Sequence, residues 1–156
     1  MWGTGRVSLV SGHLSSLASM EKMPKTPTTK APAAWFTGDV YFDVIARGEE
    51  PSRIRVNTVR FTPSARTAWH AHACGQTLHV TDGVGLVVTA EQVIVMRPGE
   101  TVWTPPGEWH WHGAAPDDFM SHLAMWEGPH PVAGEAETTW GDHVTDIEYA
   151  RAASVI

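Results

Sequence analysis

From Trp35 onward, the sequence is a succession of short β-prone runs separated by glycine, proline and aspartate turn residues. No long stretch in this region has the 3.6-residue apolar period of a helix. Many short strands at roughly even spacing are typical of an all-β sandwich or barrel. We predict strands over residues 40–45, 54–61, 68–72, 76–81, 84–89, 92–96, 101–104, 108–114 and 120–127. A short helix is predicted over 144–153, with Asp142 or Thr145 near its start.

The chain has 156 residues, a length that suits one domain, and no internal repeat is visible. Residues 24–34 are rich in proline, threonine, lysine and alanine and lack periodicity, which indicates an extended linker. We therefore divide the chain into a flexible N-terminal tail and linker over 1–33 and a single β-barrel domain over 34–153.

The composition argues against several classes of partner. Net charge is −6 and no basic cluster stands out, so we expect no binding to nucleic acid or to an anionic membrane. No apolar run reaches the ~20 residues that a membrane-spanning helix needs. The single cysteine, Cys74, excludes an internal disulfide framework and favours the cytoplasm. Residues 1–20 contain Arg6 and no acid, as in an export signal, but several serines dilute their apolar middle and favour a tail.

Two histidine pairs predict a metal site. In a strand, residues two apart point to the same face, so His70 and His72 project together, as do His110 and His112. Gln76 follows the first pair after a short turn and can add an amide oxygen. An isolated His-x-His is usually a surface pair, but two such pairs beside glycine turns favour a shared site in a barrel mouth. Imidazoles with an amide oxygen suit a divalent transition metal with positions left for water or substrate.

The same residues resemble the two motifs of the cupin family. The first motif is matched by His70-Ala71-His72, Gln76 and Gly83, and the second by Gly99, Pro105-Pro106-Gly107 and His110. Gln76 stands where the first motif usually has glutamate, Ser64 where it has glycine, and Ala114 where the second motif usually has asparagine. The resemblance implies a single-domain cupin, a jelly-roll barrel (double-stranded β-helix), with metal bound by His70, His72, Gln76 and His110.

A wider set of segments resembles the small bacterial cupins that include the manganese-dependent (R)-selective hydroxynitrile lyases. These segments are residues 34–38, 65–72, 75–78, 109–116, 122–124 and 143–149. The resemblance implies manganese(II) as the metal, with Fe(II), Co, Ni, Cu and Zn as alternatives. It also implies that His112 and His122 are catalytic residues in the cavity rather than ligands. Alternation places His122 on one strand face with Trp126, although an exposed strand histidine is the ordinary alternative.

The expected reaction is cleavage or synthesis of a cyanohydrin. The metal would act as a Lewis acid, and His122 or His112 would be the general base while the other steadies cyanide. Because Gln76 is neutral, the metal would be a stronger Lewis acid than with glutamate. The small-molecule pocket is predicted to include Asn57, Val59 and Trp126, and bulky Trp126 would narrow it against an aryl substrate.

Two other functions stay open at this stage. The same ligands around iron or copper fit a cupin dioxygenase, and the metal and pocket also fit an accessory or sensor module. Two free imidazoles beside the metal argue against a pure sensor. We expect a homodimer or homotetramer.

Overall fold

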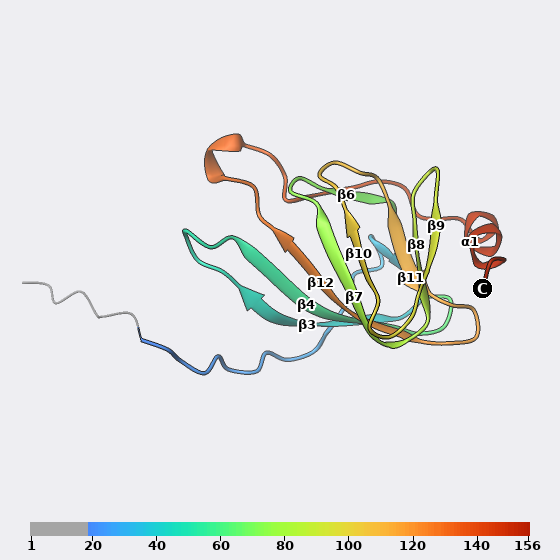
Figure 1. The fold of residues 1–156 in the computed structure, drawn as a ribbon, viewed down its shortest axis with the longest axis horizontal. Helices are drawn as coiled ribbons and strands as arrows, with labels where there is room; N and C mark the ends of the chain where they lie inside the picture. Colours follow the sequence, from blue (N-terminus) through green and yellow to red (C-terminus); the bar gives the residue numbers. More distant parts are fainter. Residues whose placement is uncertain (1–18) are drawn as a thin grey trace, which may run out of the picture.

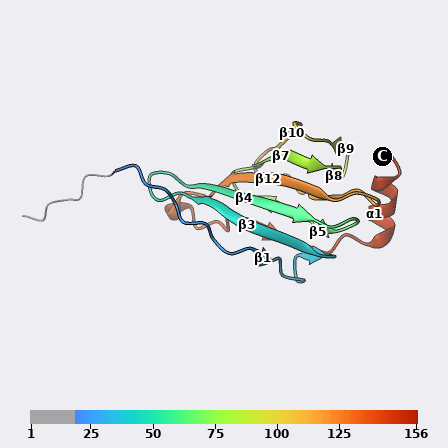
Figure 2. The ribbon, with the colours of Figure 1, turned by 90° about the horizontal axis from the view of Figure 1, so that it is seen from below.

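The strands form three antiparallel sheets in the computed structural model, which describes residues 19–156. The larger sheets have the orders β1-β3-β4-β12-β7-β10 and β2-β5-β11-β8-β9, and β13 pairs with β6 in the third. Figures 1 and 2 show the strands gathered into one barrel, with the helix α1 at one end. The strands are β1 (Thr29–Lys30), β2 (Phe36–Thr37), β3 (Val40–Arg47), β4 (Ile54–Phe61), β5 (Arg66–Thr67), β6 (His70–His72), β7 (Gln76–Gly83), β8 (Gly85–Val88), β9 (Val93–Met96), β10 (Thr101–Thr104), β11 (Trp111–Ala114), β12 (Met120–Glu127) and β13 (Thr138–Trp140).

The all-β prediction is confirmed, with differences at the strand ends. Three predicted strands, 54–61, 101–104 and 120–127, have the observed bounds. The predicted strand 68–72 begins only at His70, because the backbone N–H of Ala68 donates to Trp35 and that of Trp69 donates to Asp142 instead of continuing the ladder of β6. The prediction missed β1, β2, β5 and β13, and β1 lies within the stretch interpreted as a linker. The export-signal alternative concerned residues 1–20, and all but the last two of these lie outside the described residues.

The core lies between the two larger sheets. Along β7, Leu78 and Val80 are buried and alternate with the half-buried Thr77 and His79. Because successive side chains of a strand point to opposite faces, this alternation turns one face of β7 inward. The core residues come from both sheets: Val40, Val59, Phe61, Leu78, Val80, Val87, Met96, Ala114, Met120 and Ala124. The same inward face carries the polar side chains of the site.

Two turns explain the motif positions that glycine normally occupies. Ser64 has φ 65°, in the left-handed region that favours glycine, so serine adopts a costlier conformation there. Gly83 has φ 74°, and a Cβ atom at this position would lie 1.8 Å from the carbonyl oxygen of Phe119. Gly83 is therefore required both by its conformation and by the close approach of a neighbouring chain segment.

The C-terminal helix α1 (Asp146–Ala153) begins two residues later than predicted. Thr145 caps it: the Thr145 hydroxyl accepts from the Glu148 N–H, while the Glu148 carboxylate accepts from the Thr145 N–H. Buried Arg66 anchors the helix through its 2.6 Å ion pair with Asp146. Within residues 19–156, no helix has the length and apolar character needed to span a membrane.

Candidate metal centre and cavity

His70, His72 and His110 meet because β6 pairs back onto the segment that leads into β11. His70 and His110 form an isolated antiparallel bridge, and each backbone N–H donates to the other residue's carbonyl at 2.9 Å. The ring centroids of His70 and His110 are 4.3 Å apart, and those of His70 and His72 are 5.2 Å apart. The structure thus brings together the two histidine motifs that lie far apart in the sequence.

The Nδ1 atom of each of these three rings has a polar partner. Nδ1 of His70 lies 3.0 Å from the carbonyl oxygen of Ala68, and Nδ1 of His110 lies 2.9 Å from that of Glu108. A carbonyl oxygen only accepts, so both rings carry their proton on Nδ1 and leave Nε2 with a lone pair. Nδ1 of His72 is 3.1 Å from the Thr138 hydroxyl. Partners of this kind orient a histidine that binds metal through its other nitrogen.

Gln76 completes the predicted ligand set from the first residue of β7. Its Oε1 lies 3.0 Å from Nε2 of His110, and its side chain is buried. Nε2 of His72 is buried without any hydrogen-bond partner. A buried polar atom without a partner is costly, and a bound cation would supply the missing interaction. The donors therefore fit a divalent transition metal, which imidazole nitrogen and amide oxygen both bind.

Burial keeps these imidazoles neutral, the form that binds metal. Burial, followed by repulsion from His110, lowers the pKa of His72 to about 4. Burial also lowers the pKa of His110, and it lowers the pKa of His70 well below its ordinary value. At neutral pH all three rings are therefore neutral, with one nitrogen free of a proton, and metal binding needs no proton release from them.

His112 belongs to the same cluster. Ligand atoms of His70, His110 and His112 all lie within 4.8 Å of one another, close enough for one metal ion. His112 projects from β11, and its ring centroid is 5.2 Å from that of His70. The resemblance placed His112 outside the ligand set, whereas the structure places it in a group with His70 and His110 that does not include His72.

His122 lies behind His112. Nε2 of His122 is 3.1 Å from Nδ1 of His112, and both side chains are buried. Burial lowers the pKa of His122 to about 4. Burial, followed by repulsion from His122, lowers the pKa of His112 well below its ordinary value. Phe61 packs against both rings, at centroid distances of 5.7 Å and 5.4 Å. The exposed strand histidine is excluded by the 0% exposure of His122, but His122 lies behind His112 and not in the cavity as expected.

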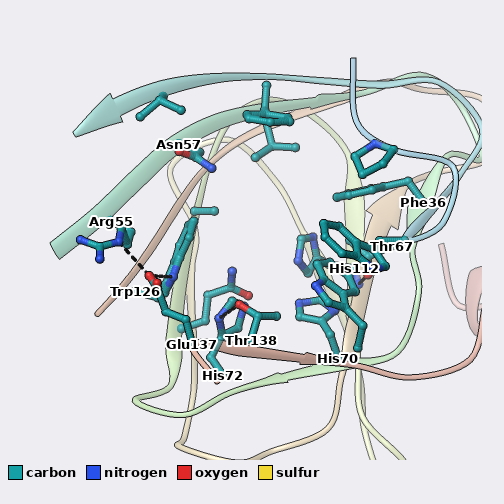
Figure 3. A pocket seen from close by; sticks show the side chains of 18 of the residues that line it. Phe36, Arg55, Asn57, Thr67, His70, His72, His112, Trp126, Glu137 and Thr138 are labelled. Atoms are coloured by element: carbon teal, nitrogen blue, oxygen red, sulfur yellow. Dashed lines mark hydrogen bonds and ion pairs between the residues drawn. The ribbon is translucent and has the colours of Figure 1, made fainter. Parts of the chain in front are cut away.

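A cavity of about 610 Å³ opens beside this cluster (Figure 3). His112 lines the cavity, whereas His122 does not. The structure places Asn57, Val59 and Trp126, the predicted pocket residues, in the lining. The remaining wall is mostly aromatic or aliphatic and includes Trp35, Phe36, Phe42, Val44, Ala46, Ala124 and Trp140. Such a lining binds the apolar part of a small molecule, while the histidines supply the polar groups.

The sequence analysis missed a further part of the cavity wall, which lies around β13. Glu137 accepts from Trp126 Nε1 at 3.1 Å and lies 2.8 Å from Nε of Arg55 (Figure 3). Thr138 contacts His72, and the Trp140 ring lies 4.8 Å from the His70 ring. The only sequence signal was a three-residue run of β-prone residues, which is too short to distinguish from a loop.

The comparisons with known proteins point to one family. A family model described as "Cupin domain" matches residues 57–126. Over 123 residues the chain is 46% identical to an (R)-mandelonitrile lyase from Granulicella tundricola, covering 78% of this chain and 91% of that protein. The chain belongs to the cupin family.

Solved cupin structures show the same fold. A cupin-like protein from Thermotoga maritima has a TM-score of 0.73 and 32% sequence identity, over 85% of this chain and 97% of that chain. A cupin 2 conserved barrel domain protein from Rhodopseudomonas palustris has a TM-score of 0.62 and 17% identity, over 83% and 89% of the two chains. The second likeness supports the fold alone. This cupin therefore has relatives that match nearly its whole barrel.

Proposed function

We propose that this cupin is a metal-dependent lyase of the hydroxynitrile lyase type, which cleaves a cyanohydrin to a carbonyl compound and hydrogen cyanide. The observation that carries the proposal is the pair His112 and His122, a neutral buried imidazole pair whose outer member lines the cavity and has a ring nitrogen within 4.8 Å of ring nitrogens of His70 and His110. The similarity to a mandelonitrile lyase over 91% of that protein supports the same reaction.

His70, His72, Gln76 and His110 would hold the metal, for which we propose manganese(II). When bound, the metal supplies Lewis acidity to an oxygen of the substrate. Gln76 would contribute a neutral amide oxygen. More of the positive charge of the metal would then act on the substrate than with a carboxylate ligand. The buried imidazoles contribute no charge either, because their pKa values are lowered.

The proton of the cyanohydrin hydroxyl would pass to His112. Nδ1 of His112 faces His122, so Nε2 is the nitrogen left to receive a substrate proton. As the proton leaves, the electron pair of the O–H bond forms the carbonyl, and the C–C bond to the nitrile breaks. Cyanide departs with the electron pair of the broken C–C bond and takes the proton from His112 to form hydrogen cyanide. His122, which lies behind His112, would orient its ring and support its transient positive charge.

The cavity would hold the rest of the substrate. Its aromatic and aliphatic wall would exclude water around the leaving cyanide. The amide of Asn57, which also lines the cavity, would offer the substrate a polar contact. The indole of Trp126 stands next to His72, with ring centroids 5.4 Å apart, and limits the room for a bulky substituent. We therefore propose small aliphatic cyanohydrins, or aryl ones that fit against Trp126, as substrates.

The test is cyanide release from racemic mandelonitrile and a small aliphatic cyanohydrin, after the metal of the isolated protein has been identified. We expect release that persists without oxygen and falls by about 10²–10⁴-fold in His112→Ala, the range of general base catalysis. His79→Ala is the matched control, because His79 bonds Thr101 on the outer side and lies outside the cavity lining. Turnover that requires oxygen would overturn the lyase and favour a dioxygenase; absence of any turnover would favour the accessory module.

A further inference from the structure

The segment of residues 137–142, here called the strap, runs alongside β6, the strand of His70 and His72, and is fixed at several points. β13 pairs with β6 so that Thr138 lies opposite His72 and Trp140 opposite His70. The N–H of Gly141 donates to the Trp69 carbonyl at 2.7 Å. Backbone pairing therefore holds the strap edge to edge with β6 and puts the side chains of Thr138 and His72 on the same face of this two-stranded sheet.

Three side chains of the strap add further contacts. Glu137 joins the strap to the cavity wall through Arg55 at 2.8 Å and Trp126 at 3.1 Å. The Trp140 ring stacks on Trp35, with centroids 5.0 Å apart and planes 2° apart. Between these two anchors, the Thr138 hydroxyl lies 3.1 Å from Nδ1 of His72 (Figure 3). The position of Thr138 is thus determined from both sides.

His72 differs from His70 and His110 in the kind of partner that its Nδ1 atom has. The other two rings face backbone carbonyls of Ala68 and Glu108, which accept only and fix the proton on Nδ1. A hydroxyl both donates and accepts, and it belongs to a side chain that substitution can remove. Nε2 of His72 is buried without a partner, so a ring with its proton on Nε2 would bury an unsatisfied donor. The proton is therefore better placed on Nδ1, with Thr138 as its acceptor.

We propose that Thr138 is a positioning residue that holds the His72 ring with Nδ1 protonated and Nε2 free to bind the metal, and that the strap keeps Thr138 in place. This inference rests on the metal centre of the proposed function but not on its reaction. Partners of metal-binding histidines contribute about 10–100-fold to metal affinity. The strap would therefore contribute to metal binding without providing a ligand.

The test compares Thr138→Val, which removes the hydroxyl at nearly constant volume, with Thr138→Ser, which retains it. Thr139→Val is the matched control, since Thr139 is the exposed neighbour in the same strand. Manganese(II) titration should give a dissociation constant raised by about 10-fold or more in Thr138→Val and changed less than about 3-fold in the other two variants. In the metal-free proteins, ¹⁵N chemical shifts should report His72 as the Nδ1–H tautomer, and as a tautomer mixture only in Thr138→Val.

An unchanged tautomer and dissociation constant in Thr138→Val would overturn the proposal, as would an equal loss in Thr139→Val. Should Thr138→Val fail to fold, Thr138→Ala against Thr138→Ser makes the same comparison. Failure of the lyase reaction gives a different result: normal manganese(II) binding in the wild type without cyanide release. Should the wild type bind no manganese(II), the tautomer measurement on the metal-free protein still decides the role of Thr138.

Discussion

His112 and His122 form a buried imidazole pair in which Nδ1 of His112 lies 3.1 Å from Nε2 of His122. The pair is ordered from the cavity inward, because His112 lines the cavity and His122 has 0% exposure. His122 therefore reaches a substrate only through His112. The sequence left open which histidine is the general base and which steadies cyanide. From this order we propose proton transfer for His112, and for His122 orientation of the His112 ring in place of contact with cyanide.

Replacing His122 by phenylalanine should lower the kcat for cyanide release while the metal content stays the same. Phenylalanine fills the space beside Phe61 but removes the nitrogen that contacts Nδ1 of His112, so the His112 ring loses its orientation. We expect a fall in kcat of about 10-fold to 100-fold, smaller than the loss in His112→Ala. Metal analysis of both variants serves as the control. A parallel loss of metal would contradict the assignment and make His122 part of the support of the metal centre.

The pattern of the strands explains how much of this site was predictable. The 120–127 strand was predicted with its observed bounds, and its alternation put His122 on the inner face. The ligand candidates followed from spacing, because period two in a strand fixes which side chains share a face. The order of His112 before His122 was not predictable, since it depends on which of two inward side chains from different strands reaches the cavity.

The strap was not predictable, for a physical reason. Thr138–Trp140 is a strand of three residues whose hydrogen bonds go to β6, far away in the sequence. Periodicity needs a longer run to emerge, and the flanking residues 128–137 carry no apolar repeat. The late start of the strand predicted at 68–72 has the same origin, because the backbone N–H of Trp69 donates to Asp142 in the strap. Local sequence pattern therefore predicts long strands well. It fails for a strand of a few residues that is held by a partner far away in the sequence.

Replacing Gln76 by glutamate should leave manganese bound but weaken catalysis. The carboxylate would keep an oxygen near Nε2 of His110, now 3.0 Å from the amide oxygen, and would bring a negative charge to the metal. That charge reduces the Lewis acidity available to the substrate, so we expect kcat to fall by about 10-fold or more. Metal analysis and steady-state cyanide release measure the two effects. An unchanged kcat would show that the neutral ligand is irrelevant to the rate.

The metal-free protein should lose stability in acid. His72 and His122 have pKa values lowered to about 4, whereas in the unfolded chain both lie near 6.5. Below pH 6.5 the unfolded chain takes up protons that the folded protein does not, so the free energy of unfolding falls as the pH decreases toward 4. Above pH 6.5 this contribution is fully present.

The expected decrease between pH 7.5 and 5 is on the order of 2 kcal/mol for each of these histidines. Urea unfolding of protein treated with a chelator measures it at the two pH values. The double variant His72→Gln, His122→Gln should show a smaller decrease, whereas His79→Ala should behave as the wild type. A free energy of unfolding that rises on acidification would refute the assigned direction.

Replacing Trp126 by leucine should shift specificity toward larger substrates. The indole lines the cavity beside His72 and is held by Glu137 at 3.1 Å, so its position is fixed rather than adjustable. One methylene is worth about 1–3 kcal/mol of discrimination in an apolar pocket, and replacing the indole frees more room than that. We therefore expect the kcat/KM for mandelonitrile, divided by that for a small aliphatic cyanohydrin, to rise by about 10-fold or more. Trp103→Leu is the matched control, since Trp103 is 65% exposed on β10 and lies outside the cavity lining. An equal ratio in the two variants would mean that Trp126 does not limit the room for the substrate.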